Sequence, residues 1–364
     1  MIKEMNWLKS RIRDIQRIEN YAFDSCLKKV LDEEKVIKLN ANENFFVPQP
    51  FLRNILEEVI ESLDPRLYPQ REEERLISAL EDYTGFPADW IVTGNGADQI
   101  IEYITKAFLK HSEEALSISP TFPMYRIIVK AQGNQFNEVS INNDFSLNVD
   151  NIQKATHPKT VLCFICSPNN PTANQFNKTN ICRIIEEFNG IVILDEAYVE
   201  FAPETITHLV NEFDNLIVLR TFSKIFGLAG LRVGYSIANP NISASLRKMQ
   251  LPYNMNTFSQ RVALRLLEEP TAINDALTRL KGERTKFIQR LNTITGIKAY
   301  NSATNFTLVK TNRSSDYVYN QLLDKNILVR KMGEIMSYKG YIRITVGLPE
   351  MNMILLNGLK EILS

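Results

Sequence analysis

The stretch VLCFICSPNNPT (residues 161–172) is a short apolar run followed by a polar turn that contains two prolines. The same kind of run recurs at residues 115–119, 191–195 and 216–220. Each run has the length and composition of a strand that is buried on both faces. Between the runs, residues 97–110 and 178–188 carry apolar side chains at the three-to-four spacing of helices that cover a sheet. This alternation predicts an α/β fold with a largely parallel sheet, in which ligands bind at the carboxyl ends of the strands.

The pattern changes after residue 256, where a long amphipathic helix is predicted over residues 271–293. A smaller α+β unit is predicted from strands at 306–309, 327–329 and 341–346 and a helix from residue 351. We therefore predict three parts for a chain of this length. They are an N-terminal arm (1–37) that packs on the small domain, a large cofactor-binding domain (38–255) and a small C-terminal domain (256–364).

The charge balance argues against partners that are held mainly by bulk charge. Lysine and arginine together number 42, as do aspartate and glutamate, so the formal net charge is zero. We therefore expect neither a nucleic acid nor a membrane surface as a partner. Residues 1–14 alternate charged and apolar side chains, which indicates neither a signal peptide nor a membrane span. We expect a cytoplasmic location.

The cysteines and histidines do not predict a metal site. The chain has three histidines, and its four cysteines stand at positions 26, 163, 166 and 182. Cys163 and Cys166 are three residues apart on a predicted strand, so their side chains point to opposite faces of the sheet. Because such a pair cannot easily share a ligand, we expect neither a metal ion nor a disulfide there.

A glycine-rich turn, TGNGAD (residues 93–98), opens the helix that is predicted from residue 97. The free backbone N–H groups at a helix start, together with the positive end of the helix dipole, can hold a phosphate group. A dinucleotide-binding motif would require a third glycine at position 99, where the chain has Gln99. The turn therefore favours a site for the phosphate of a ligand that is not a nicotinamide dinucleotide. The alternative is a simple tight turn with no ligand.

Asp195 directly follows a buried strand, so its carboxylate needs a partner that offsets the cost of desolvation. A pyridinium N–H is such a partner, because an ionised carboxylate keeps a ring nitrogen protonated and the protonated ring stabilises a neighbouring carbanion. The hydroxyl of Tyr198 and the amide of Asn170 can donate to the phenolate oxygen of the same ring. The alternative is a capping or salt-bridged aspartate among ordinary turn residues.

Lys224 follows another buried strand and shares its segment with Thr221, Ser223 and Arg232. Two hydroxyls and a guanidinium suit a phosphate group, whereas a solvated surface lysine needs no such neighbours. A lysine beside a bound aldehyde forms a Schiff base, and as a free amine it can carry a proton. One cofactor, a phosphorylated pyridine aldehyde, could use all of these segments.

With these residues, the chain resembles the histidinol-phosphate aminotransferase family, which belongs to the fold-type-I class I/II aminotransferases that use pyridoxal 5′-phosphate (PLP). The resemblance runs from about residue 39 to residue 347, and TFSKIFGLAGLRVGY (221–235) is its most specific part. It implies a large domain with a mostly parallel sheet flanked by helices, and a smaller α+β domain. It also implies a transaminase of histidine biosynthesis that converts histidinol phosphate and 2-oxoglutarate to imidazole acetol phosphate and glutamate.

The resemblance also implies roles for individual residues. Lys224 would bind the PLP aldehyde, Asp195 would pair with the pyridine nitrogen, and Tyr198 would complete the catalytic set. The other cofactor-binding residues that it implies are Ala97, Asp98, Phe122, Asn170, Ser223, Arg232 and, from the neighbouring subunit of a homodimer, Tyr68. The substrate-binding residues that it implies are Tyr21, Asn42, Arg330 and Arg343. Arg343 would anchor the substrate carboxylate, and Arg330 would bind the substrate phosphate.

The chain departs from the family pattern at two places, of which the first, near the substrate side, leaves the amino donor open and the second concerns a turn. Phe45-Phe46-Val47 stands where family members usually have Pro-Leu-Gly, and Ala173 stands where they usually have glycine. An aromatic or broad-specificity aminotransferase would keep every cofactor residue. A lyase similar to phosphothreonine decarboxylases would use the same lysine and aspartate, but it would release carbon dioxide instead of a keto acid. A catalytically silent PLP-binding regulatory protein is a third class.

Overall fold

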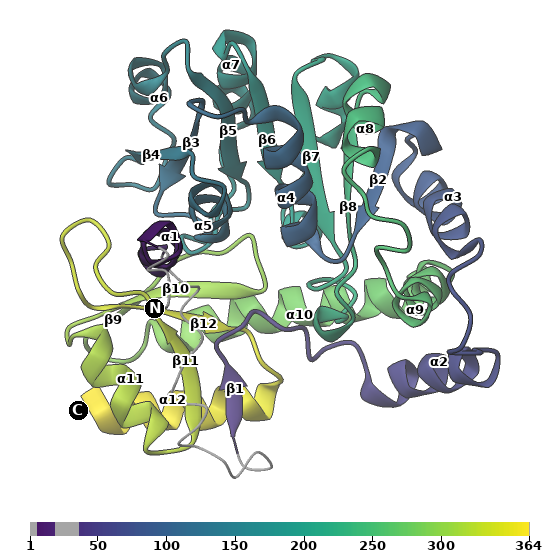
Figure 1. Ribbon diagram of the computed structural model, residues 1–364. Helices are drawn as coiled ribbons and strands as arrows, with labels where there is room; N and C mark the ends of the chain where they lie inside the picture. The colour runs from purple at the N-terminus through teal and green to yellow at the C-terminus, as the bar shows by residue number, and fades with distance from the viewer. Residues whose placement is uncertain (1–5, 19–35, 364) are drawn as a thin grey trace, which may run out of the picture.

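The computed structural model describes residues 6–18 and 36–363 of the chain (Figure 1). Its larger sheet has seven strands in the order β2-β8-β7-β6-β5-β3-β4, and β8 runs antiparallel to its neighbours. The strands are β2 (Ile91–Gly94), β3 (Glu114–Ser119), β4 (Gln135–Ser140), β5 (Thr160–Cys166), β6 (Ile191–Asp195), β7 (Leu216–Thr221) and β8 (Gly234–Ala238). The remaining pairings in this sheet are parallel, which confirms the predicted α/β fold.

Helices cover both faces of the larger sheet. On one face, α4 (Ala97–Phe108), α5 (Met124–Ala131) and α8 (Pro240–Arg247) contribute to a buried apolar cluster that contains Cys166. The main core, which contains Cys163, includes residues of α6 (Val149–Ala155), α7 (Lys178–Glu187) and α9 (Thr257–Leu267). The two cysteines thus face opposite sides of β5, as predicted. Burial on both faces explains why β5, β6 and β7 are continuous apolar runs in the sequence.

The smaller sheet has five strands in the order β1-β11-β12-β10-β9. Its strands are β1 (Ile37–Leu39), β9 (Ile297–Ala299), β10 (Phe306–Thr311), β11 (Ile327–Lys331) and β12 (Tyr341–Thr345), and its helices are α11 (Ser315–Leu323) and α12 (Pro349–Leu363). β1 pairs in parallel with β11, so a boundary at residue 38 passes through a strand of this sheet. The division of the chain into three domains stays a prediction.

The long predicted helix is α10 (Pro270–Leu291), which runs below the larger sheet toward the smaller one (Figure 1). Its Arg284 Nη1 donates to the carbonyl oxygens of Phe201, at 3.1 Å, and Thr304, at 2.8 Å. These bonds tie a segment that follows β6 to a segment that precedes β10. The other α-helices in the described part of the chain are α1 (Asn6–Gln16), α2 (Gln49–Glu61) and α3 (Glu72–Thr84).

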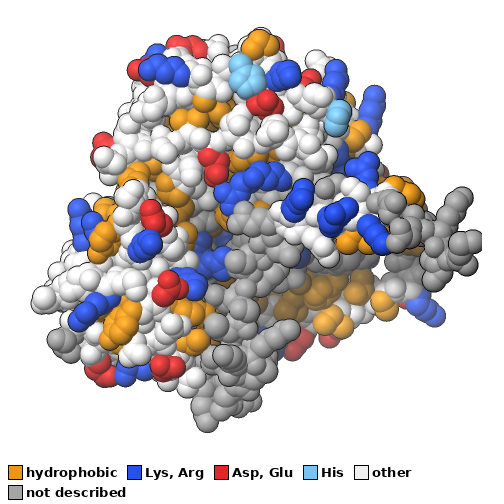
Figure 2. All heavy atoms as spheres, turned by 60° about the vertical axis from the view of Figure 1, so that its left-hand side comes forward, with side chains coloured by type: hydrophobic (Ala, Val, Ile, Leu, Met, Phe, Trp, Pro, Cys, Tyr) orange, Lys and Arg blue, Asp and Glu red, His pale blue; other side chains and the backbone are white. Residues whose placement is uncertain are grey.

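Charged side chains of both signs are interspersed over the face shown in Figure 2, as the zero net charge would suggest. None of the helices that the structure describes combines the length and the apolar composition of a membrane span.

Candidate active site

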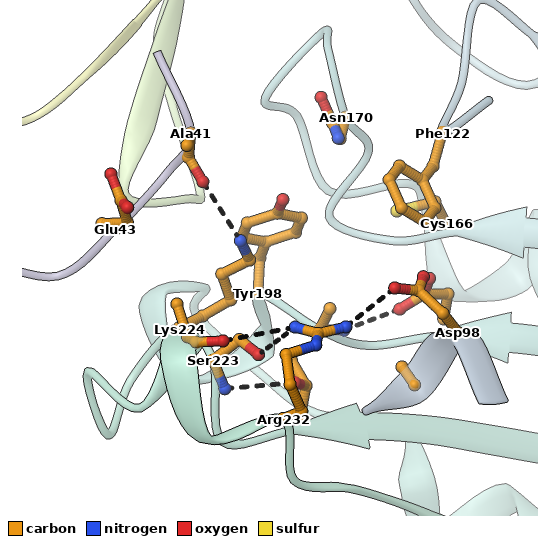
Figure 3. A pocket seen from close by; sticks show the side chains of 15 residues that line it. Ala41, Glu43, Asp98, Phe122, Cys166, Asn170, Tyr198, Ser223, Lys224 and Arg232 are labelled. Carbon is orange, nitrogen blue, oxygen red and sulfur yellow. Dashed lines mark hydrogen bonds and ion pairs between the residues drawn. The ribbon is translucent and has the colours of Figure 1, made fainter. Parts of the chain in front are cut away.

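A cavity of about 210 Å³ lies where β5, β6 and β7 end, at the edge that the parallel sheet predicts (Figure 3). Several predicted site residues line it: Ala97, Asp98, Phe122, Asn170, Asp195, Tyr198, Ser223, Lys224 and Arg232. The topology brings these distant segments together because the carboxyl ends of parallel strands share one edge of the sheet. The side chains of Asp195 and Lys224 therefore face the same small space.

Asp195 is the buried carboxylate of this cavity, with 4% of its surface exposed. Its Oδ2 accepts a hydrogen bond from the Tyr125 hydroxyl at 2.5 Å, and its Oδ1 accepts one from the Ala197 N–H at 3.0 Å. Burial raises the pKa of Asp195 to about 6, although the hydrogen bond from Tyr125 opposes the rise. A cationic partner in the cavity would therefore stabilise the ionised carboxylate. A protonated pyridine nitrogen fits this requirement.

Lys224 provides the amine of the cavity. Its Nζ lies 5.6 Å from the centre of the Tyr198 ring and donates to the Ala41 carbonyl at 3.4 Å (Figure 3). Burial, followed by the positive charges of Arg343 and Arg232, lowers the pKa of Lys224 to about 8. Roughly a tenth of this amine is then neutral at pH 7, a far larger share than for a solvated lysine. The neutral amine is the form that attacks an aldehyde.

The start of α4, Ser223 and Arg232 form a polar cradle in the lining of the cavity. Helix α4 begins at Ala97, and its N-cap, Gly96, provides no side-chain hydrogen bond to the open N–H groups. Beside it, Arg232 Nη2 pairs with Asp98 Oδ2 at 2.8 Å, and Arg232 Nη1 donates to Ser223 Oγ at 3.4 Å (Figure 3). A helix start, a hydroxyl and a guanidinium together suit a phosphate group, so the residues present fit PLP.

Replacement of Gly96 by alanine is expected to weaken PLP binding at least about tenfold. Gly96 has a φ of +81°, and a Cβ there would lie 2.6 Å from Arg232 Nη2, so the guanidinium must move away from the cradle. Titration of the cofactor-free protein with PLP measures the change. Gly85→Ala is the matched control, because Gly85 has a φ of +75° but open space around it. Equal losses of affinity in both variants would contradict this reading.

Three residues predicted on the substrate side are not in the lining of the cavity, but two of them, Asn42 and Arg343, contact residues that line it. Asn42 is buried, and its Nδ2 donates to the Tyr198 hydroxyl at 3.0 Å. Arg343 Nη1 donates to Asn170 Oδ1 at 2.7 Å. Arg330 is the Cα partner of Arg343 in the antiparallel β11–β12 pair, so both side chains leave the same face of the sheet.

The structure does not bring Tyr68, another predicted residue, to this cavity. Tyr68 is 74% exposed and stacks on Tyr253, with ring centres 4.5 Å apart. Tyr21 lies outside the described residues.

Sequence reasoning missed the side chains of Tyr125, Cys166 and Glu43 at this site, and also Ala41, Ala197 and Ala229 in the lining. Cys166 and Glu43 line the cavity. Tyr125 stands three residues after Phe122, near the start of α5, and this spacing could have pointed to it. In the structure its ring contacts that of Phe122 edge-on. Nothing in the sequence signals that its hydroxyl meets a carboxylate 70 positions away.

Comparisons with known proteins agree with this geometry. Residues 34–358 match the family described as aminotransferase class I and II. The chain is 42% identical, over 90% of its length and 93% of the relative's, to a histidinol-phosphate aminotransferase of Thermoanaerobacter pseudethanolicus. The solved histidinol-phosphate aminotransferase of Clostridium acetobutylicum is 27% identical, with a TM-score of 0.80 over 89% of this chain and 98% of that one.

The Sinorhizobium meliloti histidinol-phosphate aminotransferase, solved in complex with pyridoxal 5′-phosphate, has a TM-score of 0.87 over 96% of both chains. At 21% identity, this likeness shows the fold. The match to the class I and II family covers the sheet, the cavity and the smaller sheet alike. The chain therefore belongs to the class I and II aminotransferase family and is a PLP-dependent transaminase.

Proposed function

We propose that this chain is a histidinol-phosphate aminotransferase of histidine biosynthesis that works in the cytoplasm. It transfers the amino group of histidinol phosphate to 2-oxoglutarate, which gives imidazole acetol phosphate and glutamate. The similarity to histidinol-phosphate aminotransferases supports this proposal. The placement of Lys224 and Asp195 in one cavity, beside the start of α4, carries the transaminase part of the proposal.

Bound PLP supplies an electron sink for the negative charge that develops at the substrate Cα. In this proposal the carboxylate of Asp195 holds the pyridine nitrogen in its protonated form. Hydrogen bonds from Tyr125 and Ala197 fix the position of that carboxylate. Lys224 Nζ would hold the cofactor at its aldehyde, and as a free amine it would take the proton from the Cα of the amino donor. The Phe122 ring packs on the face of the pyridine.

We infer the remaining cofactor contacts from the residues that line the same cavity. The N–H groups of Ala97 and Asp98, the hydroxyl of Ser223 and the guanidinium of Arg232 hold the phosphate. Asn170 and Tyr198 donate to the phenolate oxygen of the ring. The Oδ1 of Asn170 already accepts from Arg343, which leaves the amide N–H groups to serve as donors.

Two arginines provide the substrate anion sites. Arg343 and Arg330 stand opposite each other on adjacent strands, and two like charges so placed favour an anion near them. Arg343 anchors the carboxylate of glutamate or 2-oxoglutarate, and Arg330 binds the phosphate of histidinol phosphate. A guanidinium accommodates either group through paired N–H donors.

The substrate assignment is tested by a titration of the PLP-loaded enzyme with histidinol phosphate, glutamate, phenylalanine and phosphothreonine. Histidinol phosphate and glutamate should convert the visible spectrum to that of the aminated cofactor. Release of carbon dioxide from phosphothreonine would show a lyase, and conversion by phenylalanine alone would show an aromatic aminotransferase.

The rate at which Lys224 binds PLP is expected to depend on pH. Because the pKa of Lys224 is lowered to about 8, the rate should rise roughly tenfold per pH unit below pH 8 and level off above it. Stopped-flow absorbance of the cofactor-free protein mixed with PLP measures the profile. Arg343→Gln removes a positive charge that lowers this pKa, so its plateau should begin at a higher pH. A wild-type plateau beginning only above pH 10 would show that the amine is not perturbed.

A homodimer explains the exposure of Tyr68. The apolar side chains of Leu67, Tyr68, Leu251 and Tyr253 are 57%, 74%, 72% and 59% exposed. Such a cluster is typical of a protein contact, and a second copy that covers it would bring Tyr68 to the phosphate cradle of its neighbour.

Leu251→Glu is expected to produce monomers, because a charge in this cluster opposes its burial. It should also weaken PLP binding severalfold through the loss of the Tyr68 contact. Sedimentation velocity and PLP titration measure the two effects. Met353→Glu, at an exposed position on α12, is the control and should leave the oligomeric state unchanged. A monomeric wild-type protein would overturn the proposal.

A further inference from the structure

Asn42 lies on the segment that follows β1 and is almost fully buried, with 1% of its surface exposed. Its N–H donates to Thr345 Oγ1 at 2.9 Å, and its carbonyl oxygen accepts from Asn305 Nδ2 at 2.8 Å. Its side-chain Nδ2 donates to the Tyr198 hydroxyl at 3.0 Å, and its Oδ1 accepts from Thr345 Oγ1 at 3.5 Å. The backbone φ is +56°, a conformation that asparagine tolerates better than most residues. Every polar group of Asn42 is therefore used within the protein.

The hydroxyl of Thr345 determines which way the Asn42 amide faces. Its oxygen accepts the backbone N–H of Asn42, and its own proton is then available to Asn42 Oδ1. The amide oxygen thus lies on the side of Thr345, and the amide NH2 faces Tyr198. In the opposite orientation, the Thr345 proton would have no acceptor on Asn42.

This orientation sets the role of the Tyr198 hydroxyl. Tyr198 is 5% exposed, and within residues 6–18 and 36–363 its hydroxyl takes part in one hydrogen bond, in which it accepts from Asn42. Its proton is consequently left for a group in the cavity that it lines with Lys224. A hydroxyl that accepts one hydrogen bond is also a stronger donor in the next.

We propose that Asn42 is a positioning residue that holds the Tyr198 hydroxyl as a donor toward the phenolate oxygen of PLP, and that it does not bind the amino donor directly. This inference rests on the proposed function of Tyr198. Thr345 and Asn305, which anchor Asn42, belong to β12 and to the segment before β10. The smaller sheet, which carries Arg343, therefore also fixes a cofactor contact of the larger one.

The first experiment measures the PLP dissociation constant of Asn42→Ala, Tyr198→Phe and the double variant. Each single substitution should raise it about three- to tenfold, the effect of one hydrogen bond. Because both act through the same hydroxyl, the double variant should bind no more weakly than Tyr198→Phe. If the two effects multiply, or if Asn42→Ala raises only the KM of the amino donor, the inference is wrong.

The second experiment uses cofactor-free protein with 13C-labelled tyrosine rings, in which Tyr198→Phe identifies the Cζ signal of Tyr198. Asn42→Asp should shift this signal, because a carboxylate accepts the proton that the amide leaves free. Thr345→Val should also shift it, and Thr345→Ser, which keeps the hydroxyl, should not. An unchanged signal in Asn42→Asp would show that the amide faces the other way. This readout needs no bound PLP, so it is independent of whether Lys224 has its proposed role.

Discussion

Lys224→Ala is expected to abolish the absorbance band that depends on the bond between Lys224 and PLP, and to lower turnover by at least about 10⁴-fold. In the proposed mechanism, the variant loses the amine that would bind the cofactor aldehyde and move the Cα proton. Its pocket keeps the phosphate cradle of Arg232 and Ser223, so PLP should still bind, although more weakly. Absorbance spectra and single-turnover kinetics measure these effects.

Two further variants separate the chemistry of Lys224 from its charge. Lys224→Arg keeps a cation but provides no nucleophile, because a guanidinium stays protonated, so it should be as inactive as the alanine variant. Lys110→Ala changes an exposed lysine in the loop that follows α4 and should behave as wild type. A fully active Lys224→Ala protein would refute the catalytic assignment.

Asp195→Asn is expected to lower turnover roughly a hundred- to a thousandfold, the loss typical of a preorganised electrostatic contact. The amide has nearly the shape of the carboxylate and can still accept from Tyr125, but it has no charge with which to hold a protonated pyridine nitrogen. The kcat of the PLP-loaded variant measures the effect. Tyr125→Phe keeps the charge and removes one hydrogen bond, so its loss should be smaller. An equal loss in both variants would show that position matters more than charge.

Asp195→Asn, which should lower turnover, should increase the stability of the cofactor-free protein. The pKa of Asp195 is raised from 3.8 to about 6 in the folded state, so the folded state binds more protons than the unfolded state between these values. Stability then falls as the pH rises from about 4 to 6, by roughly 3 kcal/mol for a shift of this size. The Asp195→Asn variant does not lose stability in this way, so it should melt at a higher temperature than wild type at pH 7. PLP should remove the advantage by neutralising the buried carboxylate.

The elements that could be predicted from the sequence are those with a strong local pattern. β6 was predicted at its observed bounds, and β5, β7, α4, α7 and α10 were predicted within a few residues of theirs. A strand that is buried on both faces is a continuous apolar run, and a helix that is buried on one face has a periodic apolar pattern. The strands β1 and β9 have three residues each, too few to show a periodicity, and neither was predicted. β1 in particular gains its place from pairing with β11, nearly 300 positions later.

By itself, the sequence determined the parallel sheet, the cavity at its edge and the residues that directly follow its strands. Asp195, Asn170 and Lys224 could be found because a polar or charged group just after an apolar run is a local feature. Only the tertiary structure decided how these groups are held: by Tyr125 on Asp195, Arg343 on Asn170, and Asn42 on Tyr198. These bonds join positions 70, 173 and 156 residues apart. A hydrogen bond across such a separation depends on the packing of whole elements, which leaves no periodic trace in the chain.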